Sequence, residues 1–77
     1  MKIETLKNGR LVIHFTDFLK DGEFNGSVYT FDEAYLTAKN RAKSIGGKEY
    51  KGADYGGGFY FLCSKDEVEK RFKTLGL

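Results

Sequence analysis

Near the start of the chain, Asn8-Gly9 separates two stretches in which apolar and polar residues alternate, residues 2–6 and 10–16. Asn-Gly in this setting is the strongest short-range signal for a β-hairpin, because both residues tolerate the positive φ angles of a tight hairpin turn. The two stretches should therefore pair as antiparallel strands. Alternate residues of the second strand should face the core: Leu11, Ile13 and Phe15.

Two Ser/Thr-x-x-Glu sequences predict the starts of two helices. The first, residues 30–33, opens a helix that ends at Gly46-Gly47, and the second, residues 64–67, opens a shorter helix that ends before Gly76. In each helix the apolar residues form a stripe of the kind that faces a core. The stripe of the first helix is Phe31, Ala34, Tyr35, Ala38, Ala42 and Ile45, and that of the second is Val68, Phe72 and Leu75.

Three further segments have the composition of strands, residues 27–30, 48–51 and 59–63. The last is apolar at every position, which indicates either a central strand covered on both faces or an aromatic face left for a partner. The element order is then β-β-β-α-β-β-α. This order predicts an α+β fold, a small two-layer domain with a mostly antiparallel sheet and the main helix packed on one face. A chain of 77 residues has room for a single globular domain, residues 1–77.

Charge and composition exclude several classes of protein. The formal net charge of +2 is far from the single-sign excess typical of strong nucleic-acid binders. One cysteine and one histidine exclude an intramolecular disulfide and the usual zinc sites with four Cys or His ligands. No apolar run has the length of a signal peptide or of a membrane span, so we expect a soluble cytoplasmic protein with no membrane partner.

Little in the sequence indicates catalysis. His14 and Cys63 are the only side chains with nucleophilic or general-base chemistry near neutral pH, and strand parity puts them on opposite faces. Residues 21–26 resemble the start of a calcium loop but lack the flanking helices of that motif. The glycine run at 56–58 precedes a strand, whereas phosphate-binding glycine loops precede a helix. We expect no catalytic residue, no metal and no cofactor.

Apolar residues at positions where a solvated surface is expected predict a protein-binding surface. The loop after the hairpin carries Phe18, Leu19 and Phe24 among turn residues, and Leu36 falls on the polar side of the first helix. Tyr55 lies in the glycine-rich segment before the last strand. The competing interpretation of the loop is that it folds over a small core.

A locally basic segment suggests a second kind of partner, a nucleic acid. Three cations of the first helix have no acid four residues upstream, and two more follow it: Lys39, Arg41, Lys43, Lys48 and Lys51. Tyr60 could stack on a base, while Phe59 and Phe61 should belong to the core. The competing interpretation is that these cations complement the helix dipole and keep the surface soluble.

The sequence therefore favours a non-catalytic module that binds another macromolecule, with a protein partner first and a nucleic acid as the alternative. Small proteins of this size and composition are frequent among phage and mobile-element inhibitors of host proteins, such as anti-CRISPR proteins, although no motif links this chain to them. Self-association through the apolar face of the strand at 59–63 is compatible with either function.

Overall fold

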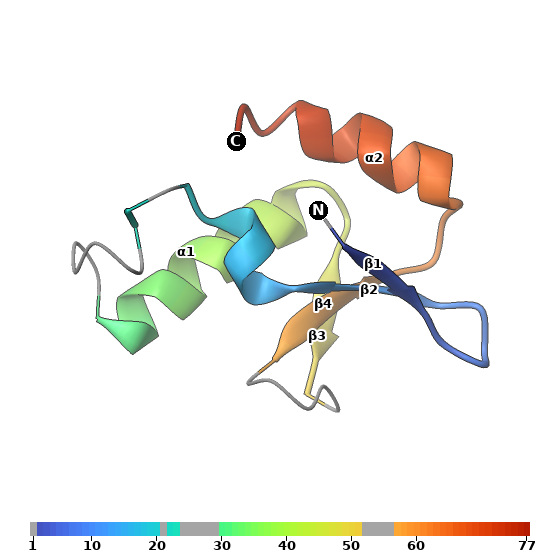
Figure 1. Cartoon of the computed structure of the whole chain (residues 1–77), viewed down its shortest axis with the longest axis horizontal. Coiled ribbons are helices and arrows are strands. Elements are labelled where there is room, and N and C mark those ends of the chain that lie inside the picture. The colour runs from blue at the N-terminus through green and yellow to red at the C-terminus, as the bar shows by residue number, and fades with distance from the viewer. Residues whose placement is uncertain (1, 21, 24–29, 52–56) are drawn as a thin grey trace.

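One antiparallel sheet with the strand order β1-β2-β4-β3 forms one layer of the protein (Figure 1). The computed structural model describes residues 2–20, 22–23, 30–51 and 57–77. Its strands are β1 (Ile3–Thr5), β2 (Leu11–His14), β3 (Lys48–Tyr50) and β4 (Gly58–Phe61). Its helices are the 3-10 helix η1 (Phe15–Phe18) and the α-helices α1 (Phe31–Ser44) and α2 (Lys65–Lys73).

Both α-helices pack on the same face of this sheet. The register of β2 with β4 puts Leu11 opposite Phe61 and Ile13 opposite Phe59, so these four buried side chains share one face. The helices and η1 add the remaining buried members of the same cluster: Phe15, Phe18, Ala38, Ala42, Ile45 and Val68. The predicted α+β fold, with a mostly antiparallel sheet and the main helix on one face, is confirmed.

The predicted hairpin is present. The amide of Leu6 donates to the carbonyl oxygen of Arg10 at 2.8 Å, and the three intervening residues form the loop. Gly9 closes this loop with a φ of 84°, a left-handed conformation that glycine adopts without steric cost. The resulting register puts Ile3 opposite Ile13, so both strands turn an isoleucine toward the helices.

The second strand ends two residues earlier than predicted. After His14 the chain turns into η1, which lies against α1 in Figure 1. Residues three apart lie above one another in a 3-10 helix, so Phe15 and Phe18 both face the core. The rings of Phe18 and Phe59 meet edge to face with centroids 5.5 Å apart. Because of this helical turn both aromatic side chains face the core, whereas in a continuous strand they would point to opposite faces of the sheet.

The start of α1 agrees with the predicted capping box. The Thr30 hydroxyl accepts a hydrogen bond from the Glu33 amide at 3.2 Å, and the Glu33 carboxylate accepts one from the Thr30 amide at 3.0 Å. Three alanines of the predicted stripe are fully buried and let the helix approach the sheet closely: Ala34, Ala38 and Ala42. The prediction that Phe31, in the same stripe, belongs to the core is wrong. Its side chain is 52% exposed, although its ring contacts Phe15 and Tyr35.

The C-terminal half contains β3, β4 and α2. The strand predicted at 59–63 is central, as expected, but it ends at Phe61, and Leu62 is 70% exposed. The Ser64 hydroxyl caps α2 by accepting from the Glu67 amide, and Val68 is buried as predicted. Of the strand predicted at 27–30, residues 27–29 lie outside the described residues and Thr30 is the N-cap of α1.

Candidate functional site

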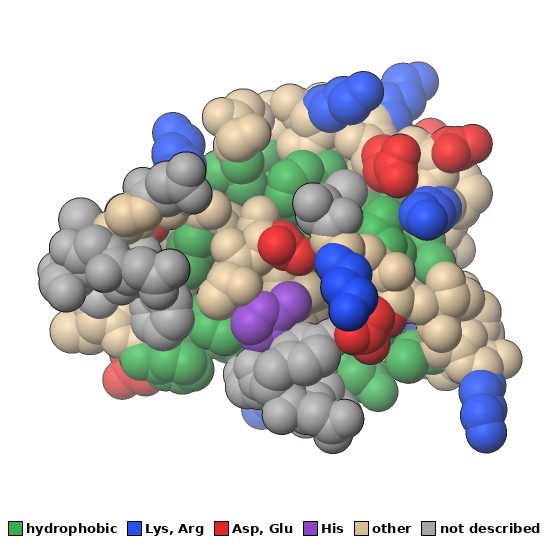
Figure 2. All heavy atoms as spheres, viewed as in Figure 1, with side chains coloured by type: hydrophobic (Ala, Val, Ile, Leu, Met, Phe, Trp, Pro, Cys, Tyr) green, Lys and Arg blue, Asp and Glu red, His purple; other side chains and the backbone are tan. Residues whose placement is uncertain are grey.

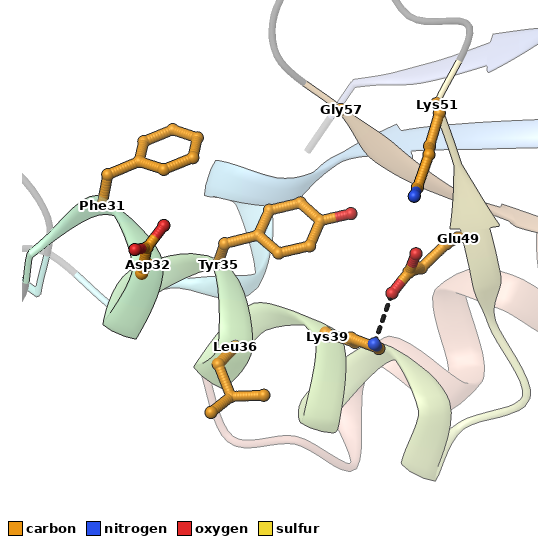
Figure 3. Close-up of a pocket in the computed structure, with 8 residues that line it drawn as sticks. All are labelled: Phe31, Asp32, Tyr35, Leu36, Lys39, Glu49, Lys51 and Gly57. Atoms are coloured by element: carbon orange, nitrogen blue, oxygen red, sulfur yellow. Dashed lines mark ion pairs between the residues drawn. The ribbon is translucent and has the colours of Figure 1, made fainter.

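A groove of about 610 Å³ runs between the N-terminal half of α1 and the edge strand β3 (Figure 3). We call it the α1–β3 groove. Five of its residues come from α1, two from β3 and the position after it, and one from the position before β4. They are Phe31, Asp32, Tyr35, Leu36, Lys39, Glu49, Lys51 and Gly57.

Aromatic and aliphatic side chains form one part of the groove. The half-buried ring of Tyr35 packs against Phe15 and Phe59, with centroids 5.5 and 5.8 Å apart, and this anchors its floor to the core. Phe31 stacks on Tyr35 at 6.4 Å and remains 52% exposed. Leu36 is 55% exposed and points away from Tyr35 and Glu49 in Figure 3. Two large apolar side chains of the N-terminal half of α1, Phe31 and Leu36, therefore reach solvent.

Cationic side chains gather at the other part of the groove. Lys39 Nζ lies 2.6 Å from Glu49 Oε1, and Figure 3 shows Lys51 pointing toward the same carboxylate. The Lys39 hydrogen bond lowers the pKa of Glu49 by more than burial raises it, and the charges of Lys39, Lys51 and Lys43 lower it further. The same hydrogen bond raises the pKa of Lys39. Two lysines, Lys39 and Lys51, thus lie beside one carboxylate, and Lys39 and Glu49 both stay charged around neutral pH.

The groove brings together residues that the sequence assigned to two different partners. Leu36 was predicted to contact a protein, and Lys39 and Lys51 to contact a nucleic acid. Sequence reasoning missed Tyr35 and Glu49 as groove residues. Tyr35 belongs to the apolar stripe and was assigned to the core, and Glu49 is ten residues from Lys39, beyond the four-residue spacing that a helix pattern can examine.

Arg41 has a structural contact that the sequence did not indicate. Its guanidinium donates to both carboxylate oxygens of Glu23, at 2.7 and 3.0 Å, and to the carbonyl oxygen of Phe18 at 2.8 Å. Lys39 and Arg41 have no acidic partner along the helix, as the sequence indicates, but both pair with carboxylates outside it. Lys43 and Lys48 are exposed, and neither has an ion-pair partner among the described residues.

Glu23→Gln is expected to lower the free energy of unfolding at pH 7 by about 1–3 kcal/mol, because the charged pair with Arg41 is lost. The hydrogen bond from Arg41, with a backbone hydrogen bond from Lys20 and despite some burial, lowers the pKa of Glu23 from 4.5 to about 2 in the folded protein. Ionised Glu23 therefore stabilises the fold fully above pH 4.5, and this contribution is lost as the pH falls from about 4.5 to about 2.

Urea unfolding at a series of pH values tests this prediction. The wild type and Glu23→Gln should differ at pH 7 and converge as the pH approaches 2. Glu69→Gln is the matched control, because Glu69 is exposed on α2 without an ion pair in the described part of the chain. A constant difference between Glu23→Gln and the wild type at every pH would contradict the assigned pair.

The prediction that Phe18 is an exposed protein-binding residue is wrong. Its side chain is fully buried, and its ring contacts Phe59, Phe61 and Phe72. Leu19 is partly buried against the same core. The interpretation of this segment as a loop folded over the core is the correct one at both positions. Phe24 and Tyr55 lie outside the described residues.

The face of the sheet opposite the helices carries Tyr60. Arg10 Cζ lies 4.5 Å from the centroid of the Tyr60 ring, a cation–π contact, and Lys48 is the cross-strand neighbour of Tyr60. Phe59 and Phe61, on the helix side of the same strand, are buried as predicted. Helices cover those two rings, so this apolar face of the strand is buried within the protein.

His14 and Cys63 lie apart. His14 is opposite Gly58, and its Nδ1 lies 2.7 Å from the Thr16 hydroxyl, while Cys63 lies five residues after Gly58 and packs against the core. Figure 2 shows His14 on a face where acidic and basic side chains are interspersed. Among residues 2–20, 22–23, 30–51 and 57–77, no group of three or more His, Cys, Asp or Glu side chains could hold a metal ion.

Comparison with known proteins gives no relative, since no protein family, curated protein or solved structure matches this chain. None of the helices in the described segments combines the length and apolar character needed to cross a lipid bilayer.

Proposed function

We propose that this protein is a non-catalytic binding module that recognises another protein through the α1–β3 groove. The observation that carries the proposal is the exposure of two large apolar side chains, Phe31 and Leu36, in a groove that also holds the ion pair of Lys39 with Glu49 and the side chain of Lys51. Apolar contact area flanked by charge is the usual composition of a protein-binding surface. Lys39 and Glu49 stay charged around neutral pH, which suits recognition of a partner's charges rather than proton transfer.

The surface of the protein is large enough for an interface of this kind. A standard protein interface buries roughly 800 Å² on each partner, about a sixth of the 4970 Å² surface of this protein. Full burial of an exposed Phe or Leu side chain contributes about 1.5–3 kcal/mol, so Phe31 and Leu36 together could supply much of the affinity. The proposal includes the inhibitor role expected from size and composition, in which the protein occupies a functional surface of a host protein.

Capture of a partner from a bacterial lysate tests the proposed surface. The wild type should retain a stoichiometric partner, and Leu36→Asp should lose it, because a carboxylate would enter an apolar contact. Leu62→Asp is the matched control, since Leu62 is also exposed but lies outside the groove. Equal retention of the partner by Leu36→Asp and Leu62→Asp would contradict the proposal.

Direct nucleic-acid binding is the second candidate. It is favoured by Lys48 and Tyr60, a cation and an aromatic ring that are cross-strand neighbours on the sheet face opposite the helices. Contacts to phosphates weaken steeply with salt, so binding should fall between about 50 and 200 mM salt. The absence of a mobility shift at low salt with single- and double-stranded DNA and RNA would eliminate this candidate.

A further inference from the structure

In the edge strand β3, some residues direct their backbone amide and carbonyl toward β4 and others direct them outward, and the register of the sheet determines which. In an antiparallel pair, successive residues of a strand direct their backbone groups alternately to one neighbour and to the other side. The Phe15 amide donates to the carbonyl oxygen of Gly57 at 3.3 Å, so the odd-numbered residues of β4 face β2. Gly58 and Tyr60 therefore face β3.

The same alternation shows which backbone groups of β3 pair with β4. Tyr50 is opposite Gly58 and Lys48 is opposite Tyr60, so the backbone groups of Tyr50 and Lys48 pair with β4. The amide and carbonyl of Glu49 then point away from β4. Because β3 is an edge strand of the sheet, these two groups face outward, where no described strand pairs with them.

The α1–β3 groove lies beside this outward edge. The side chain of Glu49 is on the helix face of the sheet, because it pairs with Lys39 of α1, and Tyr35 and Lys51 point toward it in Figure 3. An extended segment paired with Glu49 would send every second side chain to this face, toward Tyr35. Its other side chains would lie on the opposite face, beside Lys48.

Charge selects the kind of segment that can occupy the edge. Lys39, which pairs with Glu49, and Lys51 lie beside Glu49 on one face, and Lys48 lies on the other. Lysines at a sheet edge discourage pairing with unrelated strands, whereas a segment that carries carboxylates is attracted to them. A second copy of this chain fits poorly, because two-fold pairing through the free groups would set Glu49 directly opposite Glu49.

We infer that the free edge of β3 binds an extended, acidic segment of a partner protein, which adds a strand to the sheet and inserts alternate apolar side chains into the α1–β3 groove. The inference rests on the proposed function and specifies its partner. The segment's backbone exchanges two hydrogen bonds with Glu49, and its carboxylates, on the face opposite the groove, meet Lys48.

Amide hydrogen exchange of the free protein tests the first step without any partner. The amides of Lys48 and Tyr50 should exchange slowly because they pair with β4, and the amide of Glu49 should exchange much faster. Slow exchange at Glu49 with fast exchange at Lys48 and Tyr50 would overturn the inference.

A displayed library of random linear peptides, selected on the folded full-length chain, tests the binding step. Selected peptides should alternate apolar and acidic residues, and the Glu49 amide should become protected when such a peptide binds. Glu49→Pro removes the outward amide but no ladder hydrogen bond, so the sheet should tolerate it while peptide affinity falls about tenfold. Glu49→Gln retains the amide and should bind at least as tightly as the wild type.

If Glu49→Pro does not fold, a selected peptide methylated on the amide opposite Glu49 should show the same loss of affinity. The inference is overturned if no peptide is selected, if Glu49→Pro binds as the wild type does, or if an oligonucleotide alone protects this edge. If Leu36→Asp loses the partner and Glu49→Pro still captures it, the result supports the proposed function and contradicts strand addition.

Discussion

Phe18→Ala should be the most destabilising of the substitutions considered, with a loss of about 3–5 kcal/mol in the free energy of unfolding. Phe18 is fully buried, and its ring meets Phe59 at 5.5 Å and Phe72 at 5.1 Å, so it joins η1 to β4 and α2. Its removal leaves a cavity between three elements that the short chain has few other contacts to close. Urea unfolding followed by far-ultraviolet circular dichroism measures the loss.

Phe31→Ala is the matched control for this prediction. It removes the same side chain from a position that is 52% exposed, and the cost should be about 1 kcal/mol or less. Should Phe18→Ala be unfolded in buffer, Phe18→Leu should still fold and lose about 1–2 kcal/mol. Equal stability of Phe18→Ala and the wild type would instead support the interpretation of Phe18 as an exposed binding residue.

Ala38→Leu should also be strongly destabilising, with a loss of about 1–3 kcal/mol in the free energy of unfolding from overpacking. Ala38 is fully buried in the core cluster, where α1 approaches the sheet. A leucine there must displace α1, and the displacement should also disturb the neighbouring ion pair of Lys39 with Glu49 across the groove. The stability and the binding surface therefore depend on the same small side chain.

Asn40→Leu is the control for this substitution, because it introduces the same side chain two residues away at an exposed position of α1. Its stability should remain within about 0.5 kcal/mol of the wild type. Urea unfolding of both variants makes the comparison. A cost at Asn40 as large as that at Ala38 would show that leucine is unfavourable on α1 in general, against the close packing described above.

The parts of the fold predicted correctly from the sequence depend on neighbouring residues. The hairpin needs only Asn8-Gly9 and its flanking alternation, and the start of α1 needs only Thr30 and Glu33. The buried alanines follow from helical periodicity. All the residues that make up each signal are close together in the sequence, so no knowledge of tertiary structure is required to detect it.

The errors concern contacts between distant segments. Phe18 lies among turn residues, and local composition cannot distinguish an exposed loop from a 3-10 helix that folds over the core. The partners of Lys39 and Arg41 are ten and eighteen residues away, so a helix pattern treats both charges as unpaired. Phe31 fits the apolar stripe but lies at the first turn of α1, where its ring remains half exposed.

The candidate site was predicted in part. The exposure of Leu36 is confirmed, since an apolar residue on the polar side of a helix is visible from periodicity alone. The groove itself requires the pairing of β3 with β4 and the packing of α1 on the sheet, which bring Tyr35 and Glu49 to the same place. Periodicity can indicate which residues are exposed, but tertiary packing determines which of them lie together.

An NMR titration of the isotopically labelled chain with its captured partner examines the binding surface most directly. Amide shifts should change at residues 31–39 of α1 and 49–51 at the edge of the sheet, on both sides of the groove. Changes confined to Arg10, Lys48 and Tyr60 on the opposite sheet face, or to α2, would contradict recognition through the α1–β3 groove.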